Sequence, residues 1–486
     1  MVVGHPHPVL LRRRGKCQRG RKEMTKISKN KSTPLFTMKD VRRIKKLLIP
    51  KTAKELQQEK DLPIPNTMKF IHEILPQGSW KGQRCFIVGG GPSLRGMDLS
   101  FLKGELVIGV NRAFEICDPT IIFAMDERLA GWVESKQLGE DCYDKYTHFD
   151  GIKCWAFLSI LPLLPPEDYY FVKNVNGKYL SDDLASGVRH GTHSGYGALN
   201  LAVLLGASPI YLLGYDMVSA PGKKKTWWHE GYPNDGQSAA VYDLFKGEFR
   251  SAEESYRKVK ENGITIVNLN PKSGLDIFRK STVAKEKIRA ERRPIVICFY
   301  TAQYKELAMR MKLSVRRFGF ETDVVEIESK GDWLANVHYK TVFMRDKLLE
   351  HKRDIVWLDA DSVVNRYPAA FVNFDGDLGV HFIDWSRHTQ GKRSQIELDD
   401  AVTYLAYNER TLAMVEDWIK FNAVCPRRAE QLNLQIMLEQ GDYAKKGLRV
   451  VNLPAEYCTI FDTMQDVENP VIEQFQASRK FKGVLR

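Results

Sequence analysis

The sequence of 486 residues lacks the features that assign a chain quickly to several common classes. Its eight cysteines form no CxxC pair and no metal-ligand spacing, which argues against a disulfide framework and favours a reducing, cytoplasmic location. The longest apolar run, 199–213, is interrupted by Gly206, Ser208 and Pro209, so we expect no transmembrane segment. No apolar stretch follows the basic N-terminus, which excludes a typical secretory signal.

The positive charge of the chain is concentrated at its N-terminus. Residues 1–60 contain 18 Lys and Arg against 4 Asp and Glu, whereas residues 61–486 contain 55 against 56. Because the body is neutral, it offers no basic face to a nucleic acid, and we expect no nucleic-acid partner. The tail is predicted to be partly disordered. It is either simply solvated or in peripheral contact with an anionic membrane surface.

Strand and helix patterns alternate from residue 84 onward, which predicts two Rossmann-like α/β domains with mostly parallel sheets. In such sheets, ligands bind at the carboxyl ends of the strands. We expect four parts: a basic tail at 1–60, a nucleotide-binding domain at 61–278, a charged helical linker at 279–293 and a second domain at 294–486. The linker prediction rests on the high charge of that segment.

Individual elements are predicted from apolar runs and their periodicity. In the first domain we expect a buried helix at 196–205 and strands at 84–88, 106–110, 120–125, 210–213 and 264–269. In the second domain we expect helices at 303–318 and 339–351 and strands at 295–299, 323–327, 378–381, 398–408 and 448–451. A further strand begins at Ile355.

The segment 355–364 (IVWLDADSVV) is the most informative motif in the sequence. A buried strand runs into Asp359 and Asp361, and alternate residues of an extended chain point the same way, so both carboxylates can converge on one cation. Mg²⁺ and Mn²⁺ prefer oxygen ligands and typically combine one or two carboxylates with substrate phosphates. The motif therefore predicts a metal–diphosphate site. The alternative is a strand end with two solvated aspartates.

A second motif is the glycine turn GGGPSL at 89–94, which follows a predicted strand. The glycines let backbone N–H groups approach an anion, and Ser93 can add a hydroxyl donor. The next strand ends in Asn111 instead of the acidic residue of an NAD site, so NAD is not expected. Ser194 and Gly195 precede the buried helix, where the alternative role of the serine is helix capping.

Further polar residues are expected near the same sheet edge. Asp126 and Asp216 each follow a predicted strand. The polar loop 219–238 contains Trp227–Trp228, which either contact a ring of the ligand or anchor the loop. It also contains His229, which is either a general base or a solvated surface histidine.

The N-terminal motifs resemble the domain-of-unknown-function-115 family over roughly residues 80–280. GGGPSL, the strand that ends in Asn111, the HSG turn and YLLGYD occur in that order. The family includes 6-hydroxymethylpterin diphosphokinase-like and motility-associated glycosyltransferase-like proteins, and its fold is similar to that of bacterial sialyltransferases. The resemblance implies that Asp126 and Asp216 flank a second substrate. It also implies nucleotide contacts from Gly89, Gly91, Ser93, Asn111, Ser194 and Gly195.

The C-terminal motifs resemble the GT-A class of nucleotide-sugar glycosyltransferases over about residues 294–465. The Asp-x-Asp motif, a helix that starts at Glu430-Gln431 and the sequence LPAEY carry this resemblance. It implies that Asp361 is the main ligand of Mn²⁺ or Mg²⁺ and that Asp359 contacts the metal or the donor ribose. It further implies that Glu430 or Gln431 is a catalytic residue near the acceptor.

Two further features bear on the C-terminal site. The predicted helix before the motif carries Lys340, Arg345 and Lys347, which either bind the donor diphosphate or are solvated. The sequence departs from related enzymes in the histidine that often serves as a late metal ligand. No histidine follows His388, and His381 is the available substitute.

These observations predict a two-module glycosyltransferase. It would transfer a sugar from a nucleotide-sugar donor to a hydroxyl of a glycan or another acceptor, with a metal ion in the C-terminal domain. Two alternatives stay open. One is a pterin-type diphosphokinase activity in the N-terminal half, and the other is a non-catalytic, degenerate transferase that acts as a binding module.

Overall fold

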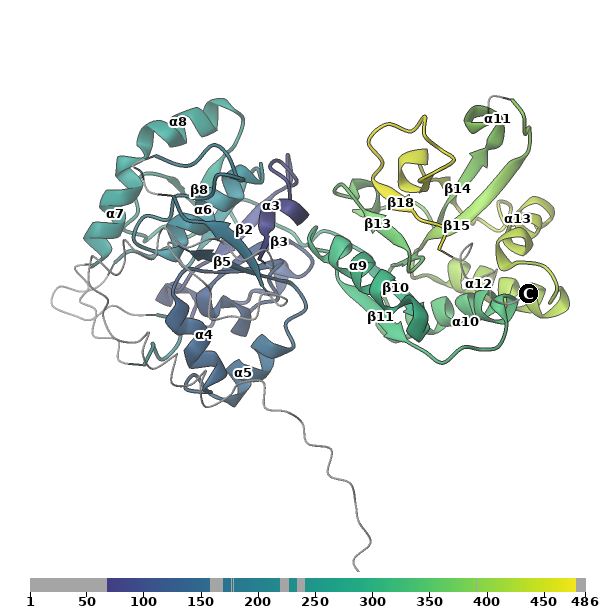
Figure 1. Ribbon diagram of the computed structural model, residues 1–486, viewed down its shortest axis with the longest axis horizontal. Helices are drawn as coiled ribbons and strands as arrows, with labels where there is room; N and C mark the ends of the chain where they lie inside the picture. The colour runs from purple at the N-terminus through teal and green to yellow at the C-terminus, as the bar shows by residue number, and fades with distance from the viewer. Residues whose placement is uncertain are drawn as a thin grey trace, which may run out of the picture. The chain divides into compact units, whose positions relative to one another are not determined.

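The computed structural model describes most of the chain beyond the N-terminal tail (Figure 1). The expected tail at 1–60 lies outside the described residues, and so does most of the polar loop at 219–238. The described strands form a nine-stranded sheet, a six-stranded sheet and a small three-stranded sheet. The described residues are 68–157, 169–175, 177, 179–218, 227–233, 241–389 and 391–477.

The first sheet is parallel throughout, with the order β1-β6-β5-β4-β3-β2-β7-β8-β9. Strands β2, β3 and β7 confirm predicted strands, whereas β5 and β6 were not predicted. The nine strands are Lys69–Phe70 (β1), Cys85–Val88 (β2), Leu106–Val110 (β3), Ile121–Ala124 (β4), Ile152–Phe157 (β5), Tyr170–Lys173 (β6), Ile210–Leu213 (β7), Ile266–Asn268 (β8) and Arg279–Lys280 (β9).

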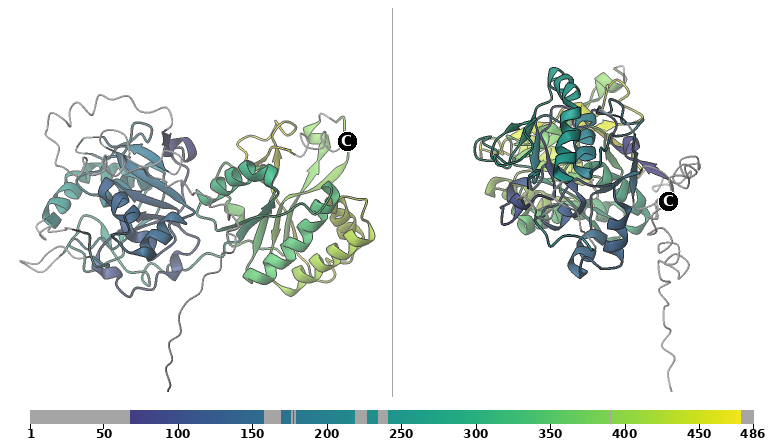
Figure 2. Two further views of the ribbon diagram at one scale, coloured as in Figure 1. Left: turned by 60° about the horizontal axis from the view of Figure 1, so that its bottom comes forward. Right: turned by 90° about the vertical axis from the view of Figure 1, so that its left-hand side faces the viewer.

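Apolar side chains bury both faces of this sheet, and helices lie along it (Figures 1 and 2). In β2, Cys85 and Ile87 belong to one core cluster, and Phe86 and Val88 belong to another. Because successive residues of a strand point to opposite faces, a continuous apolar run is buried on both sides. The helices are Ile71–Ile74 (α3), Glu127–Glu134 (α4), Glu140–Thr147 (α5), Ser194–Leu204 (α6), Val241–Ser251 (α7) and Glu253–Glu261 (α8).

The strand order creates a topological switch point at β2. From β2 the chain proceeds through β3 to β6 on one side and then returns to β7 on the other side of β2. At such a point the connections leave the sheet in opposite directions, which opens a crevice at the carboxyl ends of the strands. The glycine turn that follows β2 therefore begins at a crevice of this kind.

The charged segment 279–293 differs from the expected helical linker. Its first residues form β9, which pairs with β8, and turns and irregular chain follow. The Arg279 guanidinium donates to both carboxylate oxygens of Glu286 at 2.6 and 2.9 Å. This ion pair lies beside the edge strand β9, and the described segment forms no helical face.

The second sheet is mixed, with the order β11-β10-β12-β15-β14-β16. Strand β15 runs antiparallel to both β12 and β14, and the remaining pairs are parallel. The strands are Ile295–Tyr300 (β10), Thr322–Glu326 (β11), Ile355–Leu358 (β12), Leu378–Asp384 (β14), Ile396–Leu405 (β15) and Val450–Asn452 (β16). A separate small sheet, which was not predicted, consists of Ser362–Val364 (β13), Ile472–Gln474 (β18) and Thr459–Ile460 (β17).

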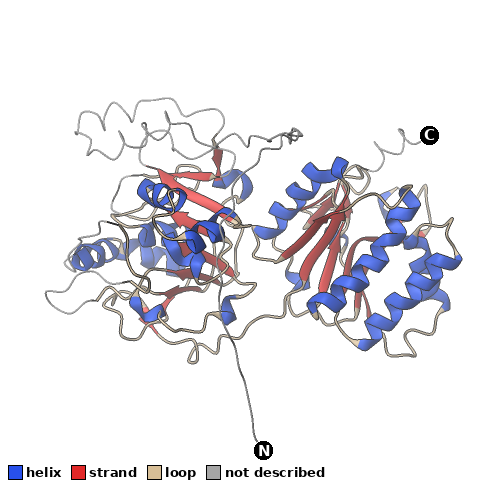
Figure 3. Cartoon of the chain, turned by 90° about the horizontal axis from the view of Figure 1, so that it is seen from below, coloured by secondary structure: helices blue, strands red, loops and turns tan. Residues whose placement is uncertain are grey.

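Helices lie on both faces of the second sheet (Figure 3). Helices α9, α10 and α13 confirm the helices expected in this part of the sequence. The five helices are Lys305–Arg316 (α9), Trp333–His351 (α10), Trp385–His388 (α11), Glu409–Val424 (α12) and Glu430–Gln440 (α13). In the part of the chain that the structure describes, no helix has both the length and the apolar character needed to cross a bilayer.

Candidate functional site

The Asp-x-Asp motif forms a tight turn at the carboxyl end of β12. The Ser362 N–H donates to the Asp359 carbonyl at 2.9 Å, and the Asp359 N–H donates to the Ala401 carbonyl of β15 at 3.0 Å. The expected extended geometry through Asp361 is therefore replaced by a turn. The reason is that β13 leaves the large sheet and pairs with β18 in the small sheet.

Each motif carboxylate is held through one of its two oxygens. Asp359 Oδ1 accepts a hydrogen bond from Trp357 Nε1 at 2.7 Å, and Asp361 Oδ2 accepts one from the Ala477 N–H at 2.5 Å. No other residue of the described chain donates a hydrogen bond to Asp359 Oδ2 or Asp361 Oδ1. Two fixed carboxylates that each offer one oxygen are a suitable donor set for a hard divalent cation. The residues therefore fit the expected metal.

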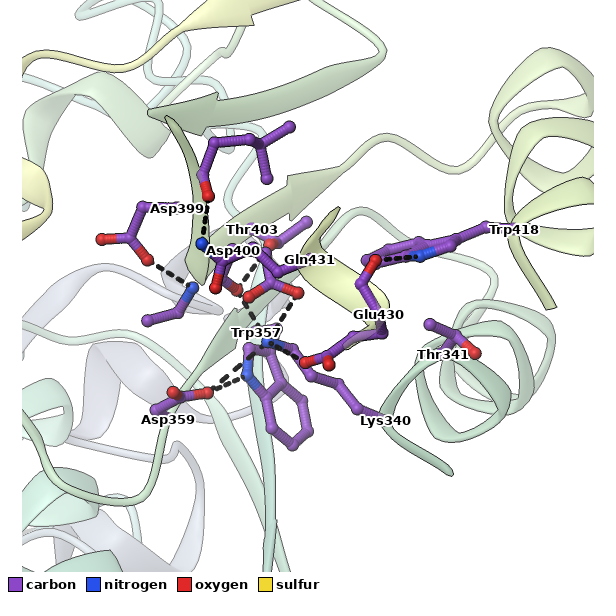
Figure 4. Close-up of polar contacts among 12 residues, drawn as sticks. Lys340, Thr341, Trp357, Asp359, Asp399, Asp400, Thr403, Trp418, Glu430 and Gln431 are labelled. Atoms are coloured by element: carbon purple, nitrogen blue, oxygen red, sulfur yellow. Dashed lines mark hydrogen bonds and ion pairs between the residues drawn. The ribbon is translucent and has the colours of Figure 1, made fainter. Parts of the chain in front are cut away.

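A buried lysine lies behind this turn (Figure 4). Lys340 of α10 is 3 % exposed, and its Nζ lies 3.0 Å from Asp400 Oδ2, 3.6 Å from Asp359 Oδ1 and 3.7 Å from Glu430 Oε1. The Lys340 ammonium also donates to the Asp400 carbonyl at 2.9 Å. Burial alone would lower the pKa of Lys340, but the three carboxylates raise it above its usual value. Lys340 is thus a permanent internal cation.

The other two cations of α10 are also engaged with acidic side chains. Arg345 pairs with Asp346 and Glu416, and Lys347 pairs with Asp323 and Glu350. Of the two roles considered for these cations, solvation is wrong for the buried Lys340, and none of the three lies free at the motif turn for a donor diphosphate.

The carboxyl groups around the turn have raised pKa values. Burial, followed by the charge of Asp359, raises the pKa of Asp361 to about 6. Burial raises the pKa of Asp399 to about 7, and burial together with the charge of Asp400 raises the pKa of Glu430 to about 8. Desolvation disfavours the charged form of a carboxyl group, and neighbouring negative charges add to this effect.

Acidic groups outnumber cations in this cluster. Lys340 pairs with three carboxylates, and no Lys, Arg or His within the described ranges forms an ion pair with Asp361 or Asp399. Buried charges are normally paired or coordinate a metal. Burial and, after it, the neighbouring negative charges raise the pKa values of Asp361, Asp399 and Glu430, which favours their protonated forms.

The two predicted catalytic residues begin α13. Glu430 is buried, and its backbone carbonyl accepts a hydrogen bond from Trp418 Nε1 at 2.9 Å. Gln431 Nε2 donates to the Leu398 carbonyl and to Glu397 Oε1 of β15. Glu430 therefore belongs to the acidic cluster, whereas Gln431 ties the start of the helix to the sheet.

His381 does not join the motif carboxylates. It lies on β14 opposite Asp399, and its buried ring shares a hydrogen bond with the Leu453 carbonyl at 2.8 Å. Among the described residues, the only three acidic or histidine side chains whose ligand atoms lie within 4.8 Å of one another are Asp323, Glu350 and His351. The Lys347 ammonium already forms ion pairs with Asp323 and Glu350 of that group.

Several residues of the C-terminal site were not found from the sequence. Asp399, Asp400, Trp357, Gln474 and Ala477 all contact the cluster, and Gln474 Nε2 donates to Asp399 Oδ2 at 3.0 Å. Two adjacent aspartates within the mostly buried strand β15 were the available signal. Nothing local to 474–477 indicated that this segment approaches the motif.

A second candidate site is a pocket of about 100 Å³ at the switch point of the first sheet. This volume is below the range of about 300–1,000 Å³ that is typical of ligand pockets. Most of the predicted N-terminal site residues line this pocket. Trp227, Trp228 and Tyr232 line it as well. The predicted residues that line it are Gly89, Gly91, Asn111, Ser194, Gly195, Asp216 and His229.

Ser93 and Asp126 lie outside this lining. The Ser93 N–H and hydroxyl donate to the two oxygens of Asp216 at 2.7 and 2.5 Å, so both donors are engaged within the protein. The residues that follow the glycines form a single 3₁₀ turn at Pro92–Leu94. Asp126 caps α4 through the Arg128 N–H and pairs with the Arg128 side chain.

The backbone of the glycine turn packs closely against the segment that follows β7. A Cβ added to Gly91 would lie 2.5 Å from the Gly214 carbonyl oxygen and 2.6 Å from Asp216 Cγ. The requirement for glycine at position 91 is thus explained by packing. A Cβ added to Gly90 would instead lie 3.2 Å from Trp227 Cδ1, on the side of the pocket.

His229 is buried, which excludes a solvated surface position. Its Nδ1 accepts a hydrogen bond from the Gly231 N–H at 3.0 Å. The rings of Trp228 and Tyr232 meet it edge-on, each with centroids 4.9 Å away. A ring nitrogen that already accepts a hydrogen bond has no free lone pair for a proton, so Nδ1 cannot serve as a general base in this arrangement. The His229 ring packs against residues of its own loop, and its catalytic role stays a prediction.

Ser194 and Gly195 begin α6, but the residue that caps this helix is His193. Its Nδ1 accepts a hydrogen bond from the Tyr196 N–H at 3.2 Å. The capping role considered for Ser194 therefore belongs to the preceding residue.

Comparison with known proteins gives matches only among solved structures. No protein-family model and no curated protein sequence matches the chain. The chain is similar to a glycosyltransferase involved in the glycosylation of the major capsid of PBCV-1, with 13% identity and a TM-score of 0.30 over 40% of this chain and 100% of the other. It is also similar to the glycosyltransferase GlyE of Streptococcus pneumoniae, with 14% identity and a TM-score of 0.25 over 38% of this chain and 55% of the other.

The acidic cluster predicts how the stability of the metal-free protein depends on pH. Asp399 and Glu430 have pKa values of about 7 and 8 in the folded state, above their ordinary values. Between about pH 4 and pH 8 these two groups therefore bind more protons in the folded state than in the unfolded chain, and their contribution to the free energy of unfolding falls as pH rises. In the presence of a chelator, the midpoint of thermal unfolding should be lower at pH 8 than at pH 5.

The variant Asp399→Asn should reduce this difference, because the removed carboxyl no longer titrates in that range. The matched control is Asp375→Asn, whose side chain is 88% exposed. It should follow the parent protein at both pH values. Equal pH dependence in Asp399→Asn and the parent would contradict the raised pKa.

Proposed function

We propose that the C-terminal half is a metal-dependent glycosyltransferase domain that binds a nucleotide sugar at the end of β12. The observation that carries this proposal is the pair of motif carboxylates, each held through one oxygen, at the carboxyl end of a parallel strand. Strand β10 is flanked by β11 and β12, and in sheets of this kind ligands bind at the carboxyl ends of the strands where the connections diverge. The buried excess of carboxyl groups supports a cation at this position.

Asp361 and Asp359 are the residues that would hold Mn²⁺ or Mg²⁺. Such an ion, when bound, neutralises the charge that develops on a leaving diphosphate. The protein contributes the fixed orientation of both carboxylates and the buried Lys340, which keeps Asp400 and Glu430 in place.

Glu430 is the residue we propose for proton transfer from the acceptor hydroxyl. An acid–base residue works best when its pKa lies near the working pH, and the pKa of Glu430 is raised to about 8. Gln431 would then position Glu430, because its side-chain amide fixes the start of α13 to β15.

The metal assignment is tested by Asp361→Asn in the full chain. This variant removes a charged ligand but keeps the shape of the side chain. We expect the Mn²⁺-dependent affinity for the donor to fall at least about 100-fold. The measurement is calorimetric titration with UDP-glucose, GDP-mannose and CMP-sialic acid, each with and without Mn²⁺.

Asp375→Asn serves as the matched control, because Asp375 precedes β14 at the opposite end of the strands from the motif and is largely exposed. It should bind like the parent. If Asp361→Asn retained the affinity of the parent in Mn²⁺, the glycosyltransferase proposal for this half would be wrong.

For the N-terminal half, we propose nucleotide binding at the switch-point pocket. The supporting observation is that the glycine turn, Asn111 and the start of α6 meet there, although they come from distant parts of the sequence. The pocket would have to widen to admit a nucleotide. In this pocket, Trp227 is the side chain that lies next to Gly90.

Gly90→Val tests this second proposal. The added side chain would enter the pocket beside Trp227 without meeting backbone, so the fold should persist while nucleotide binding by the N-terminal half is lost. The control is Gly131→Val in α4, where an added Cβ meets nothing within 4 Å. Binding is measured with CMP-, UDP- and GDP-sugars and with ATP in an Asp361→Asn background.

The ligand that binds in this experiment separates the alternatives. Sugar-nucleotide binding that Gly90→Val abolishes supports a second transferase-type site. Binding of ATP alone supports the diphosphokinase alternative. Unchanged binding in Gly90→Val would show that the turn does not contact the ligand.

A further inference from the structure

Trp357 occupies a particular position relative to the motif turn. It lies two residues before Asp359 on β12, and alternate residues of a strand share a face. Its side chain is 4 % exposed, and its ring contacts Phe299 and Phe343 with centroids 5.2 and 6.1 Å apart. The packing leaves the direction of the indole N–H fixed.

The indole nitrogen of Trp357 makes a hydrogen bond to a charged partner. Nε1 donates to Asp359 Oδ1 at 2.7 Å, a distance typical of a bond to a carboxylate. Indole is a donor only, so this nitrogen can bond to nothing but an acceptor. Asp359 is the acceptor that the strand places within reach, and Figure 4 shows the carboxylate directed toward the indole.

The same ring also supports the buried cation. Lys340 Nζ lies 5.3 Å from the centroid of the Trp357 ring and 3.6 Å from Asp359 Oδ1. Trp357 and Lys340 therefore engage the same oxygen of Asp359. The second oxygen, Oδ2, is left without a donor from another residue of the described chain, on a side chain that is 42% exposed.

We propose that Trp357 is a positioning residue, whose indole N–H fixes the rotation of the Asp359 carboxylate so that Oδ2 is available to the bound cation. This inference rests on the metal site proposed above and adds to it a residue that does not touch the metal. Groups that orient a ligand typically change metal affinity about 10- to 100-fold when they are removed.

An ordinary core role makes a different prediction. Phenylalanine could fill most of the same space among Phe299 and Phe343 without a polar atom. If packing were the only role, Trp357→Phe would lower stability slightly and would leave metal affinity unchanged. A positioning role requires that metal affinity falls although the fold persists.

The test is a titration of the full chain with Mn²⁺ alone, in which free Mn²⁺ is followed by electron paramagnetic resonance. We compare the parent, Trp357→Phe, Asp361→Asn and Trp155→Phe. Trp155 is a matched control because it is buried in β5 of the first sheet and its Nε1 has no hydrogen-bond partner in the described structure. We expect Trp357→Phe to weaken Mn²⁺ binding about 10- to 100-fold and Trp155→Phe to have no effect on it.

A second measurement does not depend on the metal. In a spectrum of ¹⁵N-labelled tryptophan indoles, the chain gives one signal for each of its nine tryptophans. Asp359→Asn replaces a charged acceptor with a neutral one, so one signal should move upfield, and Trp357→Phe should remove that same signal. The exposed control Asp375→Asn should move none.

The outcomes separate this inference from the proposed function. If Trp357→Phe binds Mn²⁺ as tightly as the parent while Asp361→Asn does not, the positioning role is wrong and the metal site stands. If Asp361→Asn also binds like the parent, the proposed metal site is wrong, and the inference is overturned with it. Should Trp357→Phe fail to fold, the indole spectrum of Asp359→Asn decides: an unchanged spectrum overturns the inference, and a single shifted signal supports it.

Discussion

The burial of one lysine among several carboxylates is the constraint on which the C-terminal half depends. Lys340 comes from α10, Asp359 from the end of β12, Asp400 from β15 and Glu430 from the start of α13. A single cation thus links two helices and two strands at one edge of the sheet. Removing it would leave uncompensated charges in the interior, which is among the costliest changes in a folded protein. This one cation does not neutralise all the carboxylates around it. The shortfall of positive charge makes this edge of the sheet suitable for a divalent ion.

Much of the fold could be predicted from the sequence because buried parallel strands are continuous apolar runs. The boundaries of β3 and β7 agree with the predicted ones, and β2 differs by one residue. Strand β5 was missed because Lys153 interrupts its run, and the small sheet was missed because its strands are too short to show a periodicity. The charged segment after 279 was assigned to a helix because composition alone does not distinguish a solvated helix from turns with local ion pairs.

The parts of the candidate site whose residues lie close together in the sequence were predictable. The spacing of Asp359 and Asp361 was sufficient to identify the motif, and the position of Glu430 at a helix start was correct. The role of Lys340 was not predictable, because its partners Asp400 and Glu430 lie far along the sequence and only the antiparallel strand β15 brings them together. The contact between Ala477 and Asp361 spans 116 positions and depends on a three-residue strand. Residue types can reveal which chemistry is available, but long-range pairing determines which groups neutralise each other.

Both candidate sites lie at the carboxyl ends of strands. They differ in how far the protein supplies hydrogen-bond donors to their carboxylates. At the glycine turn, Ser93 and Asn270 both donate to Asp216, so this carboxylate is matched with donors among the described residues. Asn111 Oδ1 in the same pocket is a buried acceptor that receives no hydrogen bond from them. At the Asp-x-Asp turn, donors from the described residues engage one oxygen of each carboxylate, and none of them donates to the other oxygen. Polar groups that a protein fully satisfies contribute mainly to its structure, whereas carboxylate oxygens without a donor are available to coordinate a cation. This difference in available carboxylate oxygens, and not the similarity in topology, is the reason why we propose transferase chemistry for the C-terminal half.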